Sequence, residues 1–233
     1  MYLDVATVQP PAIDVKFHGT TCIVAAVTRR YELKRRAERQ DETRQRIVDA
    51  TIELHQTIGA AQTTVSEIAK RAGVGRVTVY RHFPDEQTLF NACSGHYFSQ
   101  HPFPDIERWR RIPDPHDRLR EGLRDTYVWH EQNRQMIAMA LAEARELPMM
   151  APYHDFWDAA AEVLAAAWRV RGRRRSNLKA AIALALSFDT HRTLTQEQHL
   201  TEGQSIELMV HLAESAAADH PAGIRAFVSS SRA

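Results

Sequence analysis

The chain has 233 residues, a formal net charge of +1, 44% hydrophobic and 25% charged residues, which is ordinary for a globular protein. Its only cysteines, Cys22 and Cys93, lie far apart, which argues against a disulfide framework or a zinc finger. No apolar run approaches the roughly 18 residues that span a bilayer, so we expect a cytoplasmic protein. Good helix formers fill the stretches without proline or glycine, which predicts an all-α fold.

The N-terminal segment is basic. Eight basic and four acidic side chains lie between Arg29 and Arg46, and residues 1–28 contain Pro10-Pro11 and show no helical period. We therefore expect residues 1–40 to be a poorly ordered extension. A solvated tail and a phosphate-binding arm both fit such a charge run.

From Asp41 the pattern becomes helical. Ile47, Ala50 and Leu54 recur at spacings of three and four residues, which gives one apolar stripe along a helix. Gly59 follows this stripe, and glycine readily takes the left-handed conformation that ends helices.

Two short helices are predicted next. Thr64 and Glu67 have the spacing of a capping box, in which each side chain binds the backbone N–H of the other. Gly73 ends this helix, a second runs from about Gly75 to His82, and Asp85 is placed to cap the helix that follows. Two short helices joined by a tight glycine turn are typical of a helix-turn-helix.

The stretch Thr64–Leu89, TVSEIAKRAGVGRVTVYRHFPDEQTL, resembles the tetracycline-repressor (TetR) family, and Arg44–Gly59 fits the first helix of that family. The resemblance implies a three-helix head, residues 41–99, which carries the helix-turn-helix and a connecting helix. It also implies a larger helical body, residues 100–233, that binds a small-molecule effector and forms a homodimer. A sequence-specific repressor released from double-stranded operator DNA by its effector is the function that follows from the resemblance.

The resemblance places the second short helix in the major groove. Arg76 suits base readout, because a guanidinium donates two hydrogen bonds to guanine. Tyr80 and Thr64 suit phosphates. Acidic residues at 85 and 86 stand where family members often carry a phosphate-binding lysine. The predicted DNA-contacting residues are Thr64, Ser66, Gly75, Arg76, Val77, Thr78, Tyr80, Arg81 and His82.

In the body, the pattern predicts helices at about 115–131, 133–146, 152–171, 176–195 and 202–219, and a solvated loop at Arg171–Arg175. The last two helices resemble the dimerisation pair of the family, with core packing within one chain as the alternative. The residues predicted for that interface are Ala181, Ile182, Ala185, Ile206, Met209 and Leu212.

The effector pocket has no specific motif in the sequence. The apolar candidates on the body helices are Trp129, Met136, Met139, Phe156, Trp157, Phe188 and His191, each of which could also be plain core. Among them, we predict that Trp129, Phe156 and Phe188 bind the effector.

The sequence lacks the motifs of several enzyme classes. His130-Glu131 lacks the second histidine of a zinc-protease motif, and no nucleophile elbow or phosphate-binding glycine loop occurs, so we expect no enzyme, catalytic residue, metal or cofactor. Two alternatives remain. One is a non-specific architectural DNA-binding protein, and the other is a regulator whose body binds a partner protein.

Overall fold

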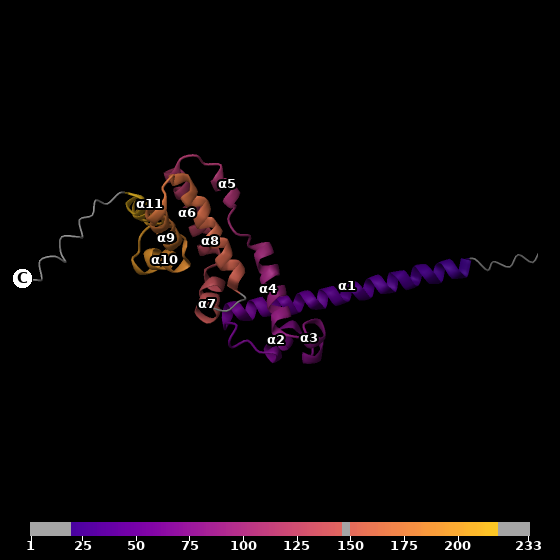
Figure 1. The fold of residues 1–233 in the computed structure, drawn as a ribbon. Helices are drawn as coiled ribbons and strands as arrows, with labels where there is room; N and C mark the ends of the chain where they lie inside the picture. Colours follow the sequence, from indigo (N-terminus) through magenta and orange to yellow (C-terminus); the bar gives the residue numbers. More distant parts are fainter. Residues whose placement is uncertain (1–19, 146–149, 219–233) are drawn as a thin grey trace, which may run out of the picture. The chain divides into compact units, whose positions relative to one another are not determined.

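The computed structural model describes residues 20–145 and 150–218, with side chains omitted for residues 20–30 and 144. All regular elements in this part of the chain are helices, as Figure 1 shows, so the all-α prediction is confirmed. Among the described helices, none combines the length and the apolar character that crossing a bilayer requires. The chain divides into two units, one ending at Arg46 and the other beginning at Ile47.

The first helix, α1 (Thr20–Thr57), begins well before the predicted start at Asp41. No glycine or proline occurs between Thr20 and Ile58, so no residue in this stretch breaks a helix. The described side chains of residues 31–42 are exposed, which explains why apolar periodicity did not reveal the helix. The rest of the predicted extension, residues 1–19, lies outside the described residues.

Three short helices complete the head. They are α2 (Val65–Ala72), α3 (Arg76–His82) and α4 (Glu86–Gln100). The predicted caps are confirmed, since the capping box at Thr64 is present and the Asp85 side chain accepts from the Thr88 N–H at 2.6 Å. Gly73 has a φ of 66°, the left-handed conformation that ends α2.

One hydrophobic cluster holds these helices together. It joins Ile47, Val48 and Leu54 of α1 to residues from the three following helices. Val79 and Phe83 are 1% and 2% exposed, so both lie inside the head. The other members are Ala50, Ile68, Ala69, Ala72, Leu89 and Cys93.

The body contains seven α-helices among the described residues. Four of them begin within one residue of the predicted starts at 115, 133, 152 and 202, one begins four residues before the predicted start at 176, and two have no predicted start. The seven helices are α5 (Ile106–Arg110), α6 (Pro115–Gln132), α7 (Arg134–Ala144), α8 (Ala151–Ala165), α9 (Gly172–Leu186), α10 (Phe188–Arg192) and α11 (Glu202–Ala217). Thr201 and Gln204 form a capping box at the start of α11.

Two predictions in the body are wrong. The arginines expected in a loop at Arg171–Arg175 lie mostly within α9, which begins at Gly172. The helix expected over 176–195 breaks at Ser187, whose side chain caps α10 by accepting from the Thr190 N–H at 3.1 Å.

Side chains of α6 satisfy the backbone carbonyls where α9 ends. The Tyr127 hydroxyl donates to the Ala185 carbonyl at 3.1 Å, and His130 Nε2 lies 2.9 Å from the Leu186 carbonyl. The last carbonyls of a helix have no partner within it, so these contacts stabilise the break at Ser187.

A buried arginine fixes the start of the body. The Arg118 guanidinium donates to the carbonyls of Ile112, Arg110 and Val163, at 2.7, 3.0 and 3.2 Å. These bonds offset the cost of burying a charge, and they hold α5 and α8 against α6.

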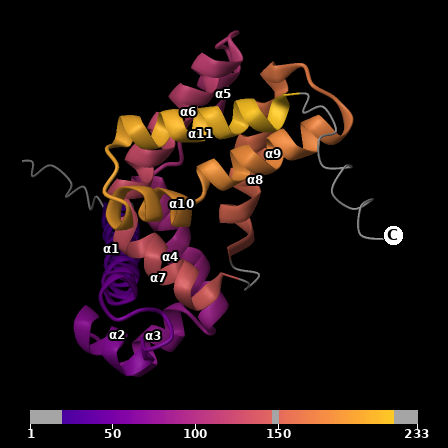
Figure 2. The same cartoon turned by 90° about the vertical axis from the view of Figure 1, so that its left-hand side faces the viewer.

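Helices α9 and α11 lie side by side (Figure 2). Of the residues predicted for a dimer interface, Ile182, Ala185, Ile206 and Met209 are buried within this chain, so they form its core instead. The large exposed apolar side chains on the same two helices are Leu184, Leu208 and Leu212, which are 53%, 45% and 37% exposed.

Candidate functional site

Helices α2 and α3 form a compact pair joined by a tight turn. The Gly73 and Val74 N–H groups donate to the carbonyls of Lys70 and Ala69, at 3.3 and 2.9 Å. Gly75 has extended backbone angles and caps α3 through its carbonyl, which accepts from the Thr78 N–H at 2.9 Å. The turn therefore fixes where α3 begins.

The side chains of α3 divide into a buried and an exposed set. Val79 is buried in the core of the head, whereas Val77 and Tyr80 are 82% and 55% exposed. Arg76 and Arg81 are also exposed. The packing of Val79 thus turns two arginines, a tyrosine and an apolar side chain outward together.

The remaining predicted contact residues follow the same division. Thr64 and Ser66 at the start of α2 are exposed, as is Gly75, whereas Thr78 and His82 are half-buried. The Thr64 hydroxyl already accepts from the Glu67 N–H at 3.2 Å. Its capping role is confirmed, and its phosphate contact stays a prediction.

The charge pattern around the pair is mixed. Arg71 of α2 pairs with Glu53 of α1, which ties these helices together at their surface. Hydrogen bonds from Thr88 lower the pKa of Asp85, so this carboxylate stays charged at the start of α4. The position at which the resemblance to the family implies a phosphate-binding lysine therefore carries negative charge in this protein.

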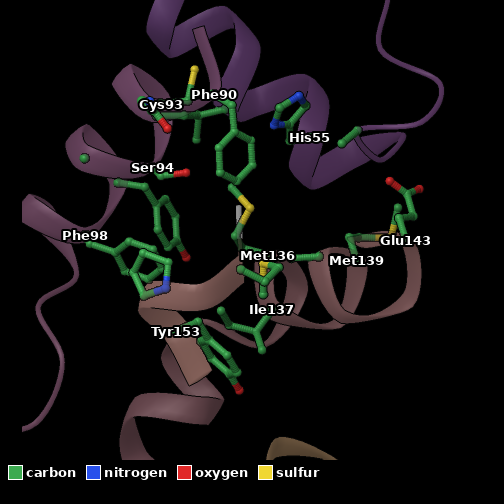
Figure 3. Close-up of a pocket in the computed structure, with 18 residues that line it drawn as sticks. His55, Phe90, Cys93, Ser94, Phe98, Met136, Ile137, Met139, Glu143 and Tyr153 are labelled. Atoms are coloured by element: carbon green, nitrogen blue, oxygen red, sulfur yellow. The ribbon is translucent and has the colours of Figure 1, made fainter. Parts of the chain in front are cut away.

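A pocket of about 330 Å³ lies between the end of α1, α4, α7 and the start of α8 (Figure 3). Its volume falls at the lower end of the range for small-molecule sites, about 300–1,000 Å³. The lining residues are Ile52, His55, Ala60, Phe90, Asn91, Cys93, Ser94, Gly95, Tyr97, Phe98, Met136, Ile137, Met139, Ala140, Glu143, Met150, Pro152 and Tyr153.

The structure does not bring the predicted effector residues together at this pocket. Trp129 and Phe156 stack on Phe103, with ring centroids 5.0 and 4.2 Å apart, and neither lines the pocket. Phe188 lines a second pocket of about 290 Å³ beside Arg145. Stacked aromatic rings in a core have the same helical spacing as rings around a cavity, so the sequence pattern does not distinguish the two.

Sequence reasoning missed the contribution of α4. Phe90 and Phe98 of this helix line the pocket, whereas Leu89 and Cys93 belong to the head core. Apolar residues on more than one side of α4 were the available signal, because a helix that packs only on the head needs one apolar stripe.

Three polar contacts surround the pocket. Glu143 Oε2 accepts from the Ala61 N–H at 2.9 Å, in the loop between α1 and α2. Gln135 Nε2 donates to the Gln56 carbonyl at 2.8 Å. The Tyr97 hydroxyl donates to Asn133 Oδ1 at 2.7 Å. Helix α7 is thereby bonded directly to the segment that leads into the helix-turn-helix.

Two histidines, one in the pocket wall and one in the body, have a pKa lowered by burial. Burial lowers the pKa of His55 in the pocket wall, and the charge of Glu143 partly opposes that effect. Burial lowers the pKa of His130 in the body to about 4. Both histidines are therefore neutral at pH 7. Groups of three or more metal-ligating side chains are not found within the described residues.

The geometry defines a helix-turn-helix protein that presents the second helix of the pair to solvent and carries a pocket behind its head. Residues 47–93 match the sequence model of the family described as bacterial regulatory proteins, tetR family. This segment is therefore similar to the tetR family, and the resemblance drawn from Thr64–Leu89 is confirmed.

Curated relatives support the assignment over part of their length. HTH-type transcriptional regulator AcrR of Shigella flexneri is 46% identical over 50 residues, 22% of this chain and 23% of the relative. HTH-type transcriptional regulator SrpR of Pseudomonas putida is 38% identical over 69 residues, 30% of this chain and 32% of the relative. The match thus spans about a quarter to a third of these relatives.

Solved structures extend the likeness to the body. A TetR family transcription regulator from Marinobacter aquaeolei VT8 has a TM-score of 0.53 and 21% identity, over 79% of this chain and all of that one. A TetR-like transcriptional regulator from Rhodococcus sp. RHA1 has a TM-score of 0.53 and 16% identity, over 76% of this chain and 97% of that one. At these identities the likeness concerns the fold alone.

Proposed function

We propose that this protein is a sequence-specific DNA-binding transcriptional regulator, a repressor that a small molecule releases from its operator. The observation that carries the proposal is the outward face of α3, where Arg76, Val77 and Tyr80 are exposed while Val79 anchors the helix. A rigid helix with such a face fits the major groove and offers both a base-reading arginine and a phosphate-binding hydroxyl.

The proposal includes a homodimer. Two heads are needed to reach half-sites about one helical turn, or roughly 34 Å, apart. Leu184, Leu208 and Leu212 support an interface on α9 and α11, because they are the large exposed apolar side chains of those two helices. We therefore propose that the dimer forms through the exposed faces of these helices.

The effector site in this proposal is the pocket between α1, α4, α7 and α8. The pocket touches α4, the helix that leads from the head into the body, and α7, which bonds to the Ala61 loop. An effector in this position would favour a dimer in which the two heads are spaced differently, which is a population shift between two states.

Selection of bound sequences from random double-stranded DNA, with the purified full chain, tests this function. A palindromic consensus is the expected result. A uniform, steeply salt-dependent affinity without consensus would instead identify a non-specific architectural protein. A partner protein that enters the pocket and competes with DNA would replace the small-molecule effector in the proposal.

A further inference from the structure

Charge is distributed very unevenly around the pocket behind the head. Among its described lining residues, Glu143 is the one acidic side chain, and neither lysine nor arginine is present. His55 in the wall has a pKa lowered by burial. The pocket therefore carries a net negative charge on an otherwise apolar surface.

Arg145, the basic residue directly after α7, has its own partner. Arg145 pairs with Asp189 at 2.6 Å and borders the second pocket rather than this one. Because no cation balances Glu143 from within the lining, an anionic ligand would be repelled there, whereas a cationic ligand would supply the missing charge.

The apolar lining also favours a cation. Phe90, Tyr97, Phe98 and Tyr153 present aromatic rings, whose faces attract positive charge. Met136, Met139 and Met150 are flexible and polarizable, and such side chains adapt to bulky ligands. Figure 3 shows Glu143 beside Met139 at one end and the aromatic rings farther along the pocket.

We propose that the effector of this protein is a hydrophobic organic cation, whose charge is recognised by Glu143 and whose apolar part lies against the aromatic and methionine lining. This proposal rests on the regulatory function proposed above and names the chemical class of its effector. Glu143 serves as a binding residue for the charge.

The same carboxylate links the ligand to the head. Glu143 Oε2 accepts from the Ala61 N–H at 2.9 Å, and Ala61 lies three residues before Thr64, the cap of α2. A cation that attracts this carboxylate weakens its bond to Ala61. Binding of the effector thereby loosens the contact between α7 and the segment that leads into the helix-turn-helix.

Gly59 shows how closely the loop and the carboxylate approach. Its φ is 86°, and a Cβ there would lie 2.8 Å from the Met139 methyl and closer still to the Glu143 carboxylate. A side chain at this position would push both residues from the pocket wall. Glycine thus allows Glu143 to be both a wall residue and an acceptor for the loop.

The test compares two ions of nearly equal size and shape but opposite charge, tetraphenylphosphonium and tetraphenylborate. Their binding to the full chain is measured by titration calorimetry, and each is then added to the complex with selected operator DNA. We expect the cation to bind at least about tenfold more tightly than the anion, and to release DNA.

Glu143→Gln is the decisive variant, since the amide keeps an acceptor oxygen for Ala61 but loses the charge. Its preference for the cation should fall severalfold, whereas Glu131→Gln, on an exposed part of α6, should keep the preference. Equal or tighter binding of the anion, an unchanged preference in Glu143→Gln, or no binding of either ion would overturn the proposal.

The two proposals fail separately. Preferential binding of the cation without release of DNA would support the class of ligand and contradict release by an effector. A protein that selects no DNA consensus would contradict the regulatory function, while the ratio of cation to anion affinity would still decide the chemistry of the pocket.

Discussion

At the scale of single residues, α3 shows how one buried side chain orients several exposed ones. Val79 is 1% exposed in the head core, and Arg76 and Tyr80, one turn before it and next to it, point to solvent. A helix has 3.6 residues per turn, so anchoring one position determines the direction of its neighbours. The predicted DNA contacts of α3 depend on that anchor.

Arg76→Ala should relax the base preference at one position of the operator half-site and cost about 1–3 kcal/mol of binding free energy to the consensus. The lost bidentate hydrogen bonds are the reason. Affinities for a set of single-base operator variants measure the effect. Arg124→Ala, which removes an exposed arginine paired with Glu121 on α6, is the control. Equal losses on every DNA sequence would mean that Arg76 binds phosphate.

At the scale of elements, two capping boxes begin helices with different tasks. Thr64 caps α2, the first helix of the helix-turn-helix, and Thr201 caps α11 in the body. In both boxes the threonine oxygen accepts from the backbone N–H three residues later. The same local chemistry therefore acts once in the helix-turn-helix and once far along the chain.

Thr64→Ala and Thr201→Ala should each lower the free energy of unfolding by about 0.5–2 kcal/mol, because a helix N-terminal N–H loses its partner. Urea denaturation followed by circular dichroism measures this loss. Only Thr64→Ala should also weaken operator binding under conditions where both proteins are fully folded. Loss of operator binding in Thr201→Ala as well would show that the effect is one of general stability.

At the scale of the whole molecule, the exposed leucines of α9 and α11 imply a partner surface. Val210 and Ile182 of these helices are fully buried in the chain, so the pair is already packed on its inner side. Its outer side still carries Leu184, Leu208 and Leu212. A second copy would bury them.

Leu208→Glu should convert the dimer into monomers, because a carboxylate would be buried at the interface without a partner for its charge. Analytical ultracentrifugation measures the change, and affinity for a two-half-site operator should fall with it. Val128→Glu provides the control, since Val128 is an exposed apolar residue on α6. A dimer that persists in Leu208→Glu would place the interface elsewhere.

Acid should destabilise the body through His130. The unfolded chain binds this proton near pH 6.5, whereas burial in the folded protein lowers the pKa to about 4. Between these values the unfolded state binds more protons, so stability is full above pH 6.5 and falls as the pH approaches 4. The loss attributable to this histidine is about 3 kcal/mol at most.

Unfolding free energies of wild type and His130→Gln across pH 4–7 test this linkage. The glutamine amide still has a donor for the Leu186 carbonyl, so the variant isolates the titration. We expect a shallower loss of stability in the variant. Parallel curves for the two proteins would assign the acid sensitivity to other groups, such as His191, whose pKa burial also lowers.

The sequence by itself determined the helix-turn-helix and its caps. Thr64, Gly73 and Asp85 act on atoms within a few residues of themselves, so local chemistry was sufficient. Of the α3 residues predicted to contact DNA, Arg76, Val77, Tyr80 and Arg81 are exposed, whereas Thr78 and His82 are half-buried. The starts of α6 and α11 were predicted from local chemistry as well, since Asp114 and Thr201 cap them locally.

Tertiary structure alone decided the pocket, the break after α9 and the role of Arg118. Each depends on groups far apart in sequence, such as Glu143 with Ala61, or His130 with the Leu186 carbonyl. A pattern of apolar spacing shows that Trp129, Phe156 and Phe188 are inside, but rings packed on each other and rings around a cavity have equal spacing. Only the packing of helices against one another separates the two.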